Sequence, residues 1–240
     1  KIRPCVFEYI YFARPDSLIN GICAYEYRKK LGIELAKETD LDADFVVPVP
    51  DSGVPAALGY AEKSKKNFEL GLIRNHYVGR TFIEPTQNIR SLGVKLKLSS
   101  TKTIVKNKSI ILIDDSLVRG TTCHKIVKML YEAGCREVHV RIACPEIKYP
   151  DFYGVDMPSH NELLAYKRSN KEMCNYIKAK TLKFLSIDGL YKALTGENRN
   201  QVYPQFSDHY FTGDYPIKPS DSLQGLGVKQ LSLLSGKSNN

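Results

Sequence analysis

The chain of 240 residues has no long hydrophobic run. A membrane-spanning helix needs about 20 consecutive apolar residues, and no stretch approaches that length. The first residues also lack the pattern of a secretory signal. We therefore expect a protein that acts in the cytoplasm without contact with a membrane. The chain opens with Lys1 rather than methionine, which indicates a fragment or a processed product.

No two of the six cysteines form a Cys-x-x-Cys pair, and several lie within apolar stretches. Zinc sites and redox motifs commonly use that missing spacing. The distribution therefore favours buried free thiols in a reduced compartment over a disulfide framework or a zinc site. The cysteines are Cys5, Cys23, Cys123, Cys135, Cys144 and Cys174.

Acidic residues are scarce between residues 74 and 108, where Glu84 is the single acid. The formal net charge of +9 suits either nucleic acid or a small polyanionic substrate. A loop this long in a compact domain is typically functional or disordered. No stacking-aromatic or helix-turn-helix pattern accompanies it, so we expect a small polyanion and no nucleic acid. Its basic residues are Arg74, Arg80, Arg90, Lys95, Lys97, Lys102, Lys106 and Lys108.

The most informative stretch begins with the apolar run Ile110–Ile113, which predicts a buried strand. Asp114 and Asp115 follow where that strand should end, and a hydroxyl-rich loop, 116–122, then leads into an amphipathic helix. In an open α/β sheet, ligands bind outside the carboxyl ends of the strands. Two acids beside a helix N-terminus there suit a ligand with sugar hydroxyls and a phosphate.

The same stretch also fits a plain solvated loop, in which Thr121 or Thr122 only caps the helix. A second small loop, Asp51-Ser52-Gly53, follows another expected strand. Its small residues would let backbone N–H groups approach an anion, although this string alone is a common turn.

Strands and helices alternate along the rest of the chain, which predicts an α/β fold with a central, mostly parallel sheet flanked by helices. Residues 1–195 form the expected domain, with a flexible basic loop at about 74–108, and 196–240 form an irregular, partly ordered extension. Ser159 and Glu162 suggest a capping box that opens another helix. Expected strands are 6–12, 45–49, 68–73, 138–143 and 182–186, and expected helices are 20–37, 54–63, 121–133 and 187–194.

The stretch Ser109–Thr122, SIILIDDSLVRGTT, resembles the signature of type I phosphoribosyltransferases, which bind phosphoribosyl pyrophosphate (PRPP). Other strings resemble glutamine PRPP amidotransferases, which make phosphoribosylamine, the first committed intermediate of purine synthesis. These strings are EYIYFARPDS at 8–17, NHYVGRTFI at 75–83, YPDFYGVDMPS at 149–159 and YFTGDYP at 210–216. The resemblance covers residues 1 to about 216 and implies the type I phosphoribosyltransferase fold.

The resemblance implies a role for each part of the site. Asp114 and Asp115 would be the catalytic pair, accepting hydrogen bonds from the ribose and sharing Mg²⁺ with Ser52. The loop Asp51–Gly53 would cradle pyrophosphate. Residues expected to wrap the 5-phosphate are Ser116, Val118, Arg119, Gly120, Thr121 and Thr122. Residues expected to close over PRPP from the basic loop are Arg74, Arg80 and Lys95.

The resemblance also implies ammonia as the nucleophile, purine nucleotides as inhibitors and a homo-oligomer. Family members carry an N-terminal glutaminase domain, which has no counterpart in this chain. We therefore expect no glutamine hydrolysis and, at most, a reaction that uses free ammonia. Two alternatives of the same fold stay open: a catalytically silent PRPP- or nucleotide-binding regulator, and a salvage enzyme that joins a free base to PRPP.

Some members of the family hold a [4Fe–4S] cluster with four cysteines. Cys5 matches the first ligand position, but Asp151 stands at the second. The last pair is replaced within FSDHY at 206–210, which contains no cysteine. We therefore expect no cluster, and we expect Cys5 to be a packed thiol.

Overall fold

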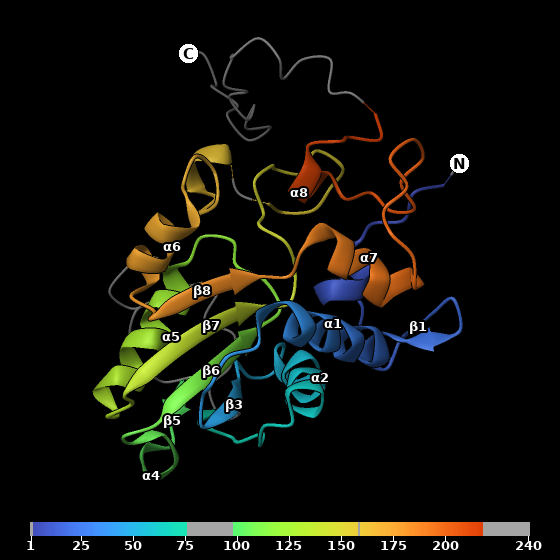
Figure 1. The fold of residues 1–240 in the computed structure, drawn as a ribbon. Coiled ribbons are helices and arrows are strands. Elements are labelled where there is room, and N and C mark those ends of the chain that lie inside the picture. The colour runs from blue at the N-terminus through green and yellow to red at the C-terminus, as the bar shows by residue number, and fades with distance from the viewer. Residues whose placement is uncertain (1, 76–97, 158, 218–240) are drawn as a thin grey trace, which may run out of the picture.

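The central sheet has four parallel strands in the order β3-β6-β7-β8 (Figure 1). The structure, a computed structural model, describes residues 2–75, 98–157 and 159–217. β6 lies at the centre, and its side chains from Ser109 to Ile113 are all buried. This arrangement confirms the predicted parallel sheet. The strands are β3 (Phe45–Pro48), β6 (Ser109–Asp114), β7 (Glu137–Ile142) and β8 (Thr181–Phe184).

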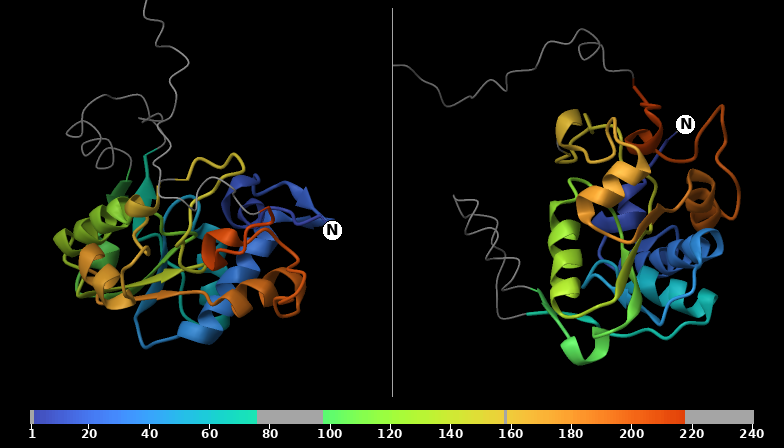
Figure 2. Two further views of the ribbon diagram at one scale, coloured as in Figure 1. Left: turned by 90° about the horizontal axis from the view of Figure 1, so that it is seen from above. Right: turned by 60° about the vertical axis from the view of Figure 1, so that its left-hand side comes forward.

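Helices cover both faces of this sheet, which confirms the predicted α/β architecture (Figures 1 and 2). α1 (Ala24–Thr39), α2 (Val54–Ser64) and α7 (Ile187–Thr195) pack on one face. α5 (Thr121–Glu132) and α6 (Asn170–Ile177) pack on the other. Among the described helices, none is both long and apolar enough to cross a membrane.

α1 and α2 approach each other through glycines. A Cβ atom on Gly32 would lie 1.8 Å from the carbonyl oxygen of Ala56, and one on Gly59 would lie 2.0 Å from that of Lys29. Both contacts are with backbone atoms, which cannot rotate out of the way as a side chain can. The two helices therefore pack with their backbones in direct contact.

We expect Gly32→Ala to lower the free energy of unfolding by about 1–3 kcal/mol, because the added methyl group forces α1 away from α2. Urea unfolding measures the change. Glu26→Ala, on the exposed side of the same helix, is the control and should stay within about 0.5 kcal/mol. An equal loss in both variants would show that the α1–α2 contact can widen without cost.

The N-terminal segment differs from the prediction. Residues 6–12, expected as a strand, contain the π-helical turn η1 (Glu8–Phe12). The backbone N–H groups of Tyr9 and Ile10 both donate to the carbonyl oxygen of Val6. The turn lets the Phe7 ring meet Tyr210, with ring centres 4.7 Å apart. Aromatic packing thus overrides the strand preference of these residues.

The first helix also begins later than expected. β1 (Leu18–Ile19) and β2 (Ile22–Cys23) form a short hairpin, and α1 starts after it at Ala24. Asn20 and Gly21 make the turn with φ angles of 50° and 79°. Asn-Gly favours this left-handed conformation in two-residue hairpins, so the prediction of a helix from Asn20 was wrong.

The ends of the expected basic loop are ordered. β4 (Leu72–Arg74) pairs antiparallel with β5 (Leu98–Ser100), and α4 (Lys102–Val105) follows. The expected strand at 68–73 is thereby reduced to β4, with an isolated bridge between Phe68 and Val46. The middle of the expected loop, 76–97, lies outside the described residues.

The capping box forms ten residues later than predicted. Ser159 is followed by the short 3₁₀ turn η2 (His160–Glu162). The helix stops there because the Leu164 N–H donates to the carbonyl oxygen of Val118 rather than to a helical carbonyl. Ser169 and Glu172, which repeat the same spacing, form a complete capping box at the start of α6.

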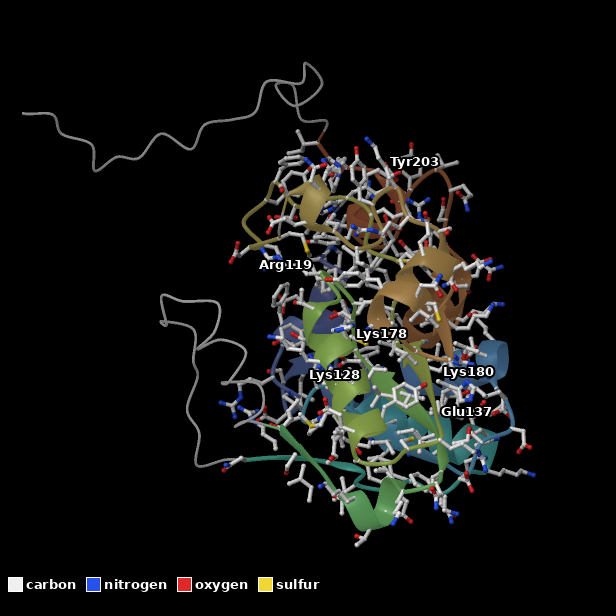
Figure 3. All side chains as sticks on the ribbon, turned by 90° about the vertical axis from the view of Figure 1, so that its left-hand side faces the viewer. Arg119, Lys128, Glu137, Lys178, Lys180 and Tyr203 are labelled. Atoms are coloured by element: carbon white, nitrogen blue, oxygen red, sulfur yellow. The ribbon has the colours of Figure 1, made fainter. Side chains whose placement is uncertain are left out.

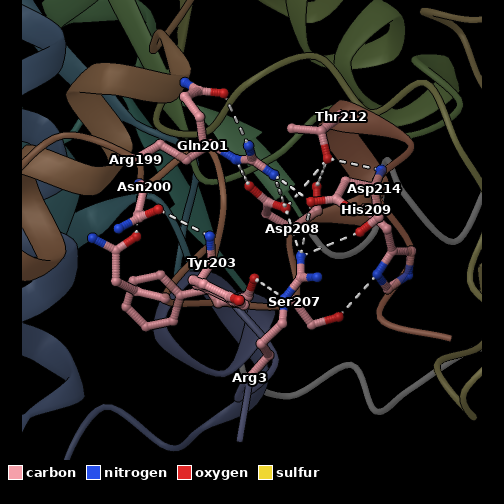
Figure 4. Close-up of polar contacts among 12 residues, drawn as sticks. Arg3, Arg199, Asn200, Gln201, Tyr203, Ser207, Asp208, His209, Thr212 and Asp214 are labelled. Carbon is pink, nitrogen blue, oxygen red and sulfur yellow. Dashed lines mark hydrogen bonds and ion pairs between the residues drawn. The ribbon is translucent and has the colours of Figure 1, made fainter. Parts of the chain in front are cut away.

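The described part of the expected extension, 196–217, packs against the domain. It contains α8 (His209–Thr212) and a fully buried carboxylate, Asp208. Asp208 accepts a hydrogen bond from Arg199 Nε at 2.6 Å (Figure 4). It also accepts one from the Tyr191 hydroxyl at 2.8 Å. Residues 218–240 lie outside the described part.

The imidazole of His139 on β7 gives the fold a dependence on pH. Burial lowers the pKa of His139, and the positive charge of Arg141 lowers it further against the pull of Glu137. The unfolded chain therefore takes up a proton first as the pH falls below about 6.5, and stability is lost there. We expect the free energy of unfolding, measured in urea, to fall between pH 7.5 and pH 5.5. It should fall less in His139→Gln. Equal slopes in both proteins would exclude His139 as the source.

Candidate active site

A cavity of about 580 Å³ opens at the carboxyl end of β6. The Asp-Asp pair, the loop after it and the start of α5 supply one wall. Most of the predicted site residues line this cavity. The cavity thus brings together the segment that follows β3 and the segment that begins at the end of β6. The predicted residues that line it are Ser52, Asp114, Asp115, Ser116, Val118, Arg119, Gly120, Thr121 and Thr122.

Asp114 stands between the two loops. Its Oδ1 accepts hydrogen bonds from Ser52 Oγ at 3.4 Å and from the Asp115 N–H at 3.0 Å. Removal from water raises the pKa of Asp114 well above its usual range, and the neighbouring carboxylate of Asp115 adds to this. A cation or a donated hydrogen bond from a ligand would relieve both effects.

Asp115 is buried, and its Oδ2 accepts a hydrogen bond from Ser116 Oγ at 2.7 Å. Among the described residues, no group of three or more His, Cys, Asp or Glu could hold a metal by itself. The nearby donors are all oxygens, from Ser52, Asp114 and Asp115, as a hard cation prefers. They fit Mg²⁺ that takes its remaining ligands from substrate phosphate and water.

The start of α5 is suited to an anion. Gly120, its N-cap, has a φ of 75° and no side chain to cap the helix. This left-handed conformation favours glycine, and a Cβ there would also lie 2.6 Å from Cδ2 of Leu164, which would have to shift. The helix therefore presents its first N–H groups and its dipole to the cavity.

Arg119 lines the same cavity but is already paired. Its guanidinium Nη2 lies 3.1 Å from Oε1 of Glu162 on η2, and both side chains are more than half exposed. Figure 3 shows Arg119 near one end of α5, with Lys128 further along that helix. Glu137 and Lys180, labelled in the same view, form an ion pair at the other end of the sheet. Arg119 thus ties the loop 116–122 to η2.

In the small loop after β3, Asp51, Ser52 and Gly53 make different contacts. Asp51 forms an ion pair with Arg74, and both line a second cavity that shares Ser52 with the first. The peptide bond between Pro50 and Asp51 is cis. The Gly53 N–H donates to the carbonyl oxygen of Val49 at 2.9 Å, so this amide serves the loop itself. Of the expected loop cations, Arg80 and Lys95 lie outside the described residues.

A buried cation supports the wall formed by η1. Arg28 on α1 is 6% exposed and donates to the carbonyl oxygens of Tyr9 at 3.1 Å and Ala13 at 2.6 Å. Burial lowers the pKa of Arg28, and the negative charge of Asp115 opposes this. Arg28 thus fixes η1 beside the acidic pair.

A largely apolar part of the cavity was not predicted from the sequence. Further lining residues are Phe7, Tyr11, Phe12, Val49, Pro50, Leu98, Leu117, Cys123, Val155, Asp156 and Met157. Several belong to the EYIYFARPDS and YPDFYGVDMPS strings. The resemblance of these strings to the amidotransferases was the one feature of the sequence that could have pointed to them. Most of these side chains are apolar, so no residue among them stood out as a candidate for binding or catalysis. Burial raises the pKa of the Cys123 thiol well above its usual range, which keeps it protonated.

The positions compared with cluster ligands hold hydrogen-bonded side chains. Cys5 Sγ lies 3.4 Å from the Tyr210 hydroxyl. Asp151 Oδ1 lies 2.8 Å from Nε2 of His209. These contacts give Cys5 and Asp151 packing partners of their own.

Comparison with known proteins assigns this geometry to a family. The model of the phosphoribosyl transferase domain matches residues 24–150. The amidophosphoribosyltransferase of Rhizobium etli is 57% identical over 97% of this chain and 47% of its own length. Amidophosphoribosyltransferase 2 (chloroplastic) of Arabidopsis thaliana is 51% identical over 91% of this chain and 38% of its own length.

A solved structure agrees. Glutamine PRPP amidotransferase from B. subtilis, complexed with ADP and GMP, superposes with a TM-score of 0.82 at 48% identity. The alignment covers 91% of this chain and 48% of that one, so this chain spans about half the length of that relative. The chain belongs to the phosphoribosyl transferase domain family and corresponds to the phosphoribosyltransferase part of the amidophosphoribosyltransferases.

Proposed function

We propose that this chain transfers ammonia to C1 of PRPP and releases pyrophosphate, giving 5-phosphoribosylamine. The observation that carries the proposal is the joint placement of an acidic pair, a hydroxyl-rich loop and a helix N-terminus around one cavity. Such a site offers acceptors for ribose hydroxyls and donors for a phosphate. In the longer relatives this reaction would begin purine synthesis.

The acidic pair would do two things during transfer. Asp114 and Asp115 accept hydrogen bonds from the ribose hydroxyls and so fix the sugar. Loss of pyrophosphate builds positive charge on the ring, which the same carboxylates stabilise. Mg²⁺, held by Ser52, Asp114 and Asp115, would neutralise charge on the pyrophosphate when bound. Ammonia is already a competent nucleophile, so the site needs to position it and exclude water rather than supply a base.

The phosphates would bind at the two loops. Residues Ser116–Thr122 would offer N–H groups and hydroxyls to the 5-phosphate, and the loop Asp51–Gly53 would cradle the pyrophosphate. Arg74 is placed to meet that pyrophosphate if it releases Asp51. Purine nucleotides also present a ribose and a 5-phosphate, so we expect them to compete for this site. We further propose that glutamine supplies the ammonia in a longer protein and that the chain forms homo-oligomers.

Pyrophosphate release from PRPP tests the proposal. We expect release that requires both Mg²⁺ and ammonium salts and that purine nucleotides inhibit. Calorimetry should first establish that PRPP binds. Binding without release at high ammonia would identify a silent PRPP-binding protein instead. Release that depends on a free purine or pyrimidine base would identify a salvage enzyme.

A further inference from the structure

One wall of the cavity belongs to a loop without helix or strand. Val155, Asp156 and Met157 line the cavity from this loop, which we define as residues 149–157. A loop of this kind needs fixed contacts if it is to hold a wall in place. Those contacts centre on the carboxylate of Asp151.

Asp151 organises its own loop. Its Oδ2 accepts hydrogen bonds from the backbone N–H of Tyr153 at 2.7 Å and of Val155 at 2.8 Å. The second bond ends on a residue of the cavity wall. The Asp151 side chain is only 1% exposed, so water does not compete for these bonds. The backbone bonds lower the pKa of Asp151 against the effect of burial, which keeps the carboxylate charged.

The other oxygen of Asp151 reaches the C-terminal segment, 206–217. Its Oδ1 lies 2.8 Å from Nε2 of His209, whose side chain is also 1% exposed. His209 Nδ1 lies 3.0 Å from Ser207 Oγ (Figure 4). With Nε2–H donating to the carboxylate, Nδ1 is free to accept from the Ser207 hydroxyl. The ring is held by Tyr210 and Tyr215, at centre distances of 4.0 and 4.8 Å.

Backbone contacts align the two segments around this pair. The N–H groups of Lys148 and Tyr149 donate to the carbonyl oxygen of Tyr210 at 2.9 and 3.1 Å. The Tyr215 hydroxyl donates to the carbonyl oxygen of Pro150 at 2.9 Å. The segments touch along their length, and the Asp151–His209 contact continues through Asp151 to the amide of Val155, a cavity residue.

We propose that Asp151 and His209 are positioning residues for the active site. The chain of contacts runs from Ser207 through His209 and Asp151 to the Val155 amide and so to the wall of the cavity. A segment near residue 209 thereby sets the shape of a site whose acids lie near residue 114. The proposal rests on the proposed function, because it takes PRPP as the ligand that this wall meets.

Asp151→Ala and His209→Gln test the proposal in the full 240-residue chain. We expect Asp151→Ala to speed hydrogen exchange at the Tyr153 and Val155 amides and to raise the KM for PRPP about tenfold, a change that corresponds to about 1.4 kcal/mol. His209→Gln should act in the same direction. Asp151→Asn keeps an oxygen for the two amides, so it should recover most of the affinity.

Tyr191→Phe is the matched control, because it removes a hydrogen bond to Asp208 in the same region without touching loop 149–157. It should leave the KM for PRPP unchanged. A fall in kcat at constant KM in Asp151→Ala would mean fewer folded molecules rather than a displaced wall, and would overturn the proposal. If Asp151→Ala does not fold, Asp151→Asn and His209→Gln decide by the same criterion.

Hydrogen exchange separates this proposal from the proposed function. Faster exchange at Val155 with unchanged PRPP binding would show that the pair holds the loop but does not shape the site, which overturns the positioning role. If the unaltered chain fails to bind PRPP, the proposed function fails, and the role in PRPP binding falls with it. Exchange at the two amides would still report whether Asp151 fixes the loop.

Discussion

Replacing Asp114 and Asp115 together by asparagine is expected to lower the rate of pyrophosphate release from PRPP by at least about 1000-fold. Loss of one group that stabilises transition-state charge commonly costs a factor of about 100 to 1000. Here both acceptors proposed for the ribose are neutralised, and two of the oxygen ligands proposed for Mg²⁺ lose their charge. Residues that act as a unit are not additive, so each single variant should already show most of the loss.

The double variant Asp42→Asn with Asp188→Asn is the control. Both residues are exposed, and the change in net charge is the same. Its rate should match that of the unaltered chain at equal salt. Melting temperature and circular dichroism establish that the Asp114 and Asp115 variants are folded. Turnover that persists in the folded double variant would remove this pair from the mechanism.

Replacing Asp208 by alanine is expected to lower the free energy of unfolding by about 3–5 kcal/mol. Asp208 is fully buried and accepts two hydrogen bonds from Arg199, whose side chain is 9% exposed. Nη2 of Arg3 lies 3.6 Å from Oδ1 of Asp208. Hydrogen bonding to Asp208 raises the pKa of Arg199. The guanidinium also stays charged when Asp208 is removed, because arginine is not deprotonated in proteins. The variant therefore leaves a buried cation without its buried carboxylate, and the half-exposed Asp214 remains as its partner.

Asp214→Ala provides a matched control for this prediction. Asp214 contacts the same two arginines, but its side chain is 45% exposed. Water can replace it, so the loss should stay below about 1 kcal/mol. Urea unfolding of both variants gives the comparison. If both variants lose the same free energy of unfolding, burial of Asp208 does not strengthen its ion pairs.

The sheet and the acidic half of the site were predictable because their signals are local. The run Ile110–Ile113 becomes β6, and the helix after Gly120 follows its own apolar spacing. Parallel pairing then places Asp114 at the same edge as Ser52, 3.4 Å from its hydroxyl. Short-range pattern and the rules of α/β topology were sufficient there.

The rest depended on contacts between distant segments. Ser159 and Ser169 open the same four-residue pattern, yet only the second starts an α-helix. The difference lies in Leu164, whose N–H is taken by Val118, 46 positions earlier in the sequence. In the same way, Phe7 bends its segment into η1 because it packs on Tyr210. Local sequence patterns therefore do not predict which serine starts an α-helix or that residues 8–12 form η1.

The walls of the cavity come from parts of the chain that are far apart in sequence: 7–12, 49–52, Leu98, 114–123 and 155–157. An unfolded chain has no such site, so a ligand that fills the cavity binds the folded state alone. By mass action, free ligand at 100 times its dissociation constant would add about 2.7 kcal/mol to the free energy of unfolding. Substrate supply would then govern how long the chain survives heat or proteolysis, as well as how fast it turns over.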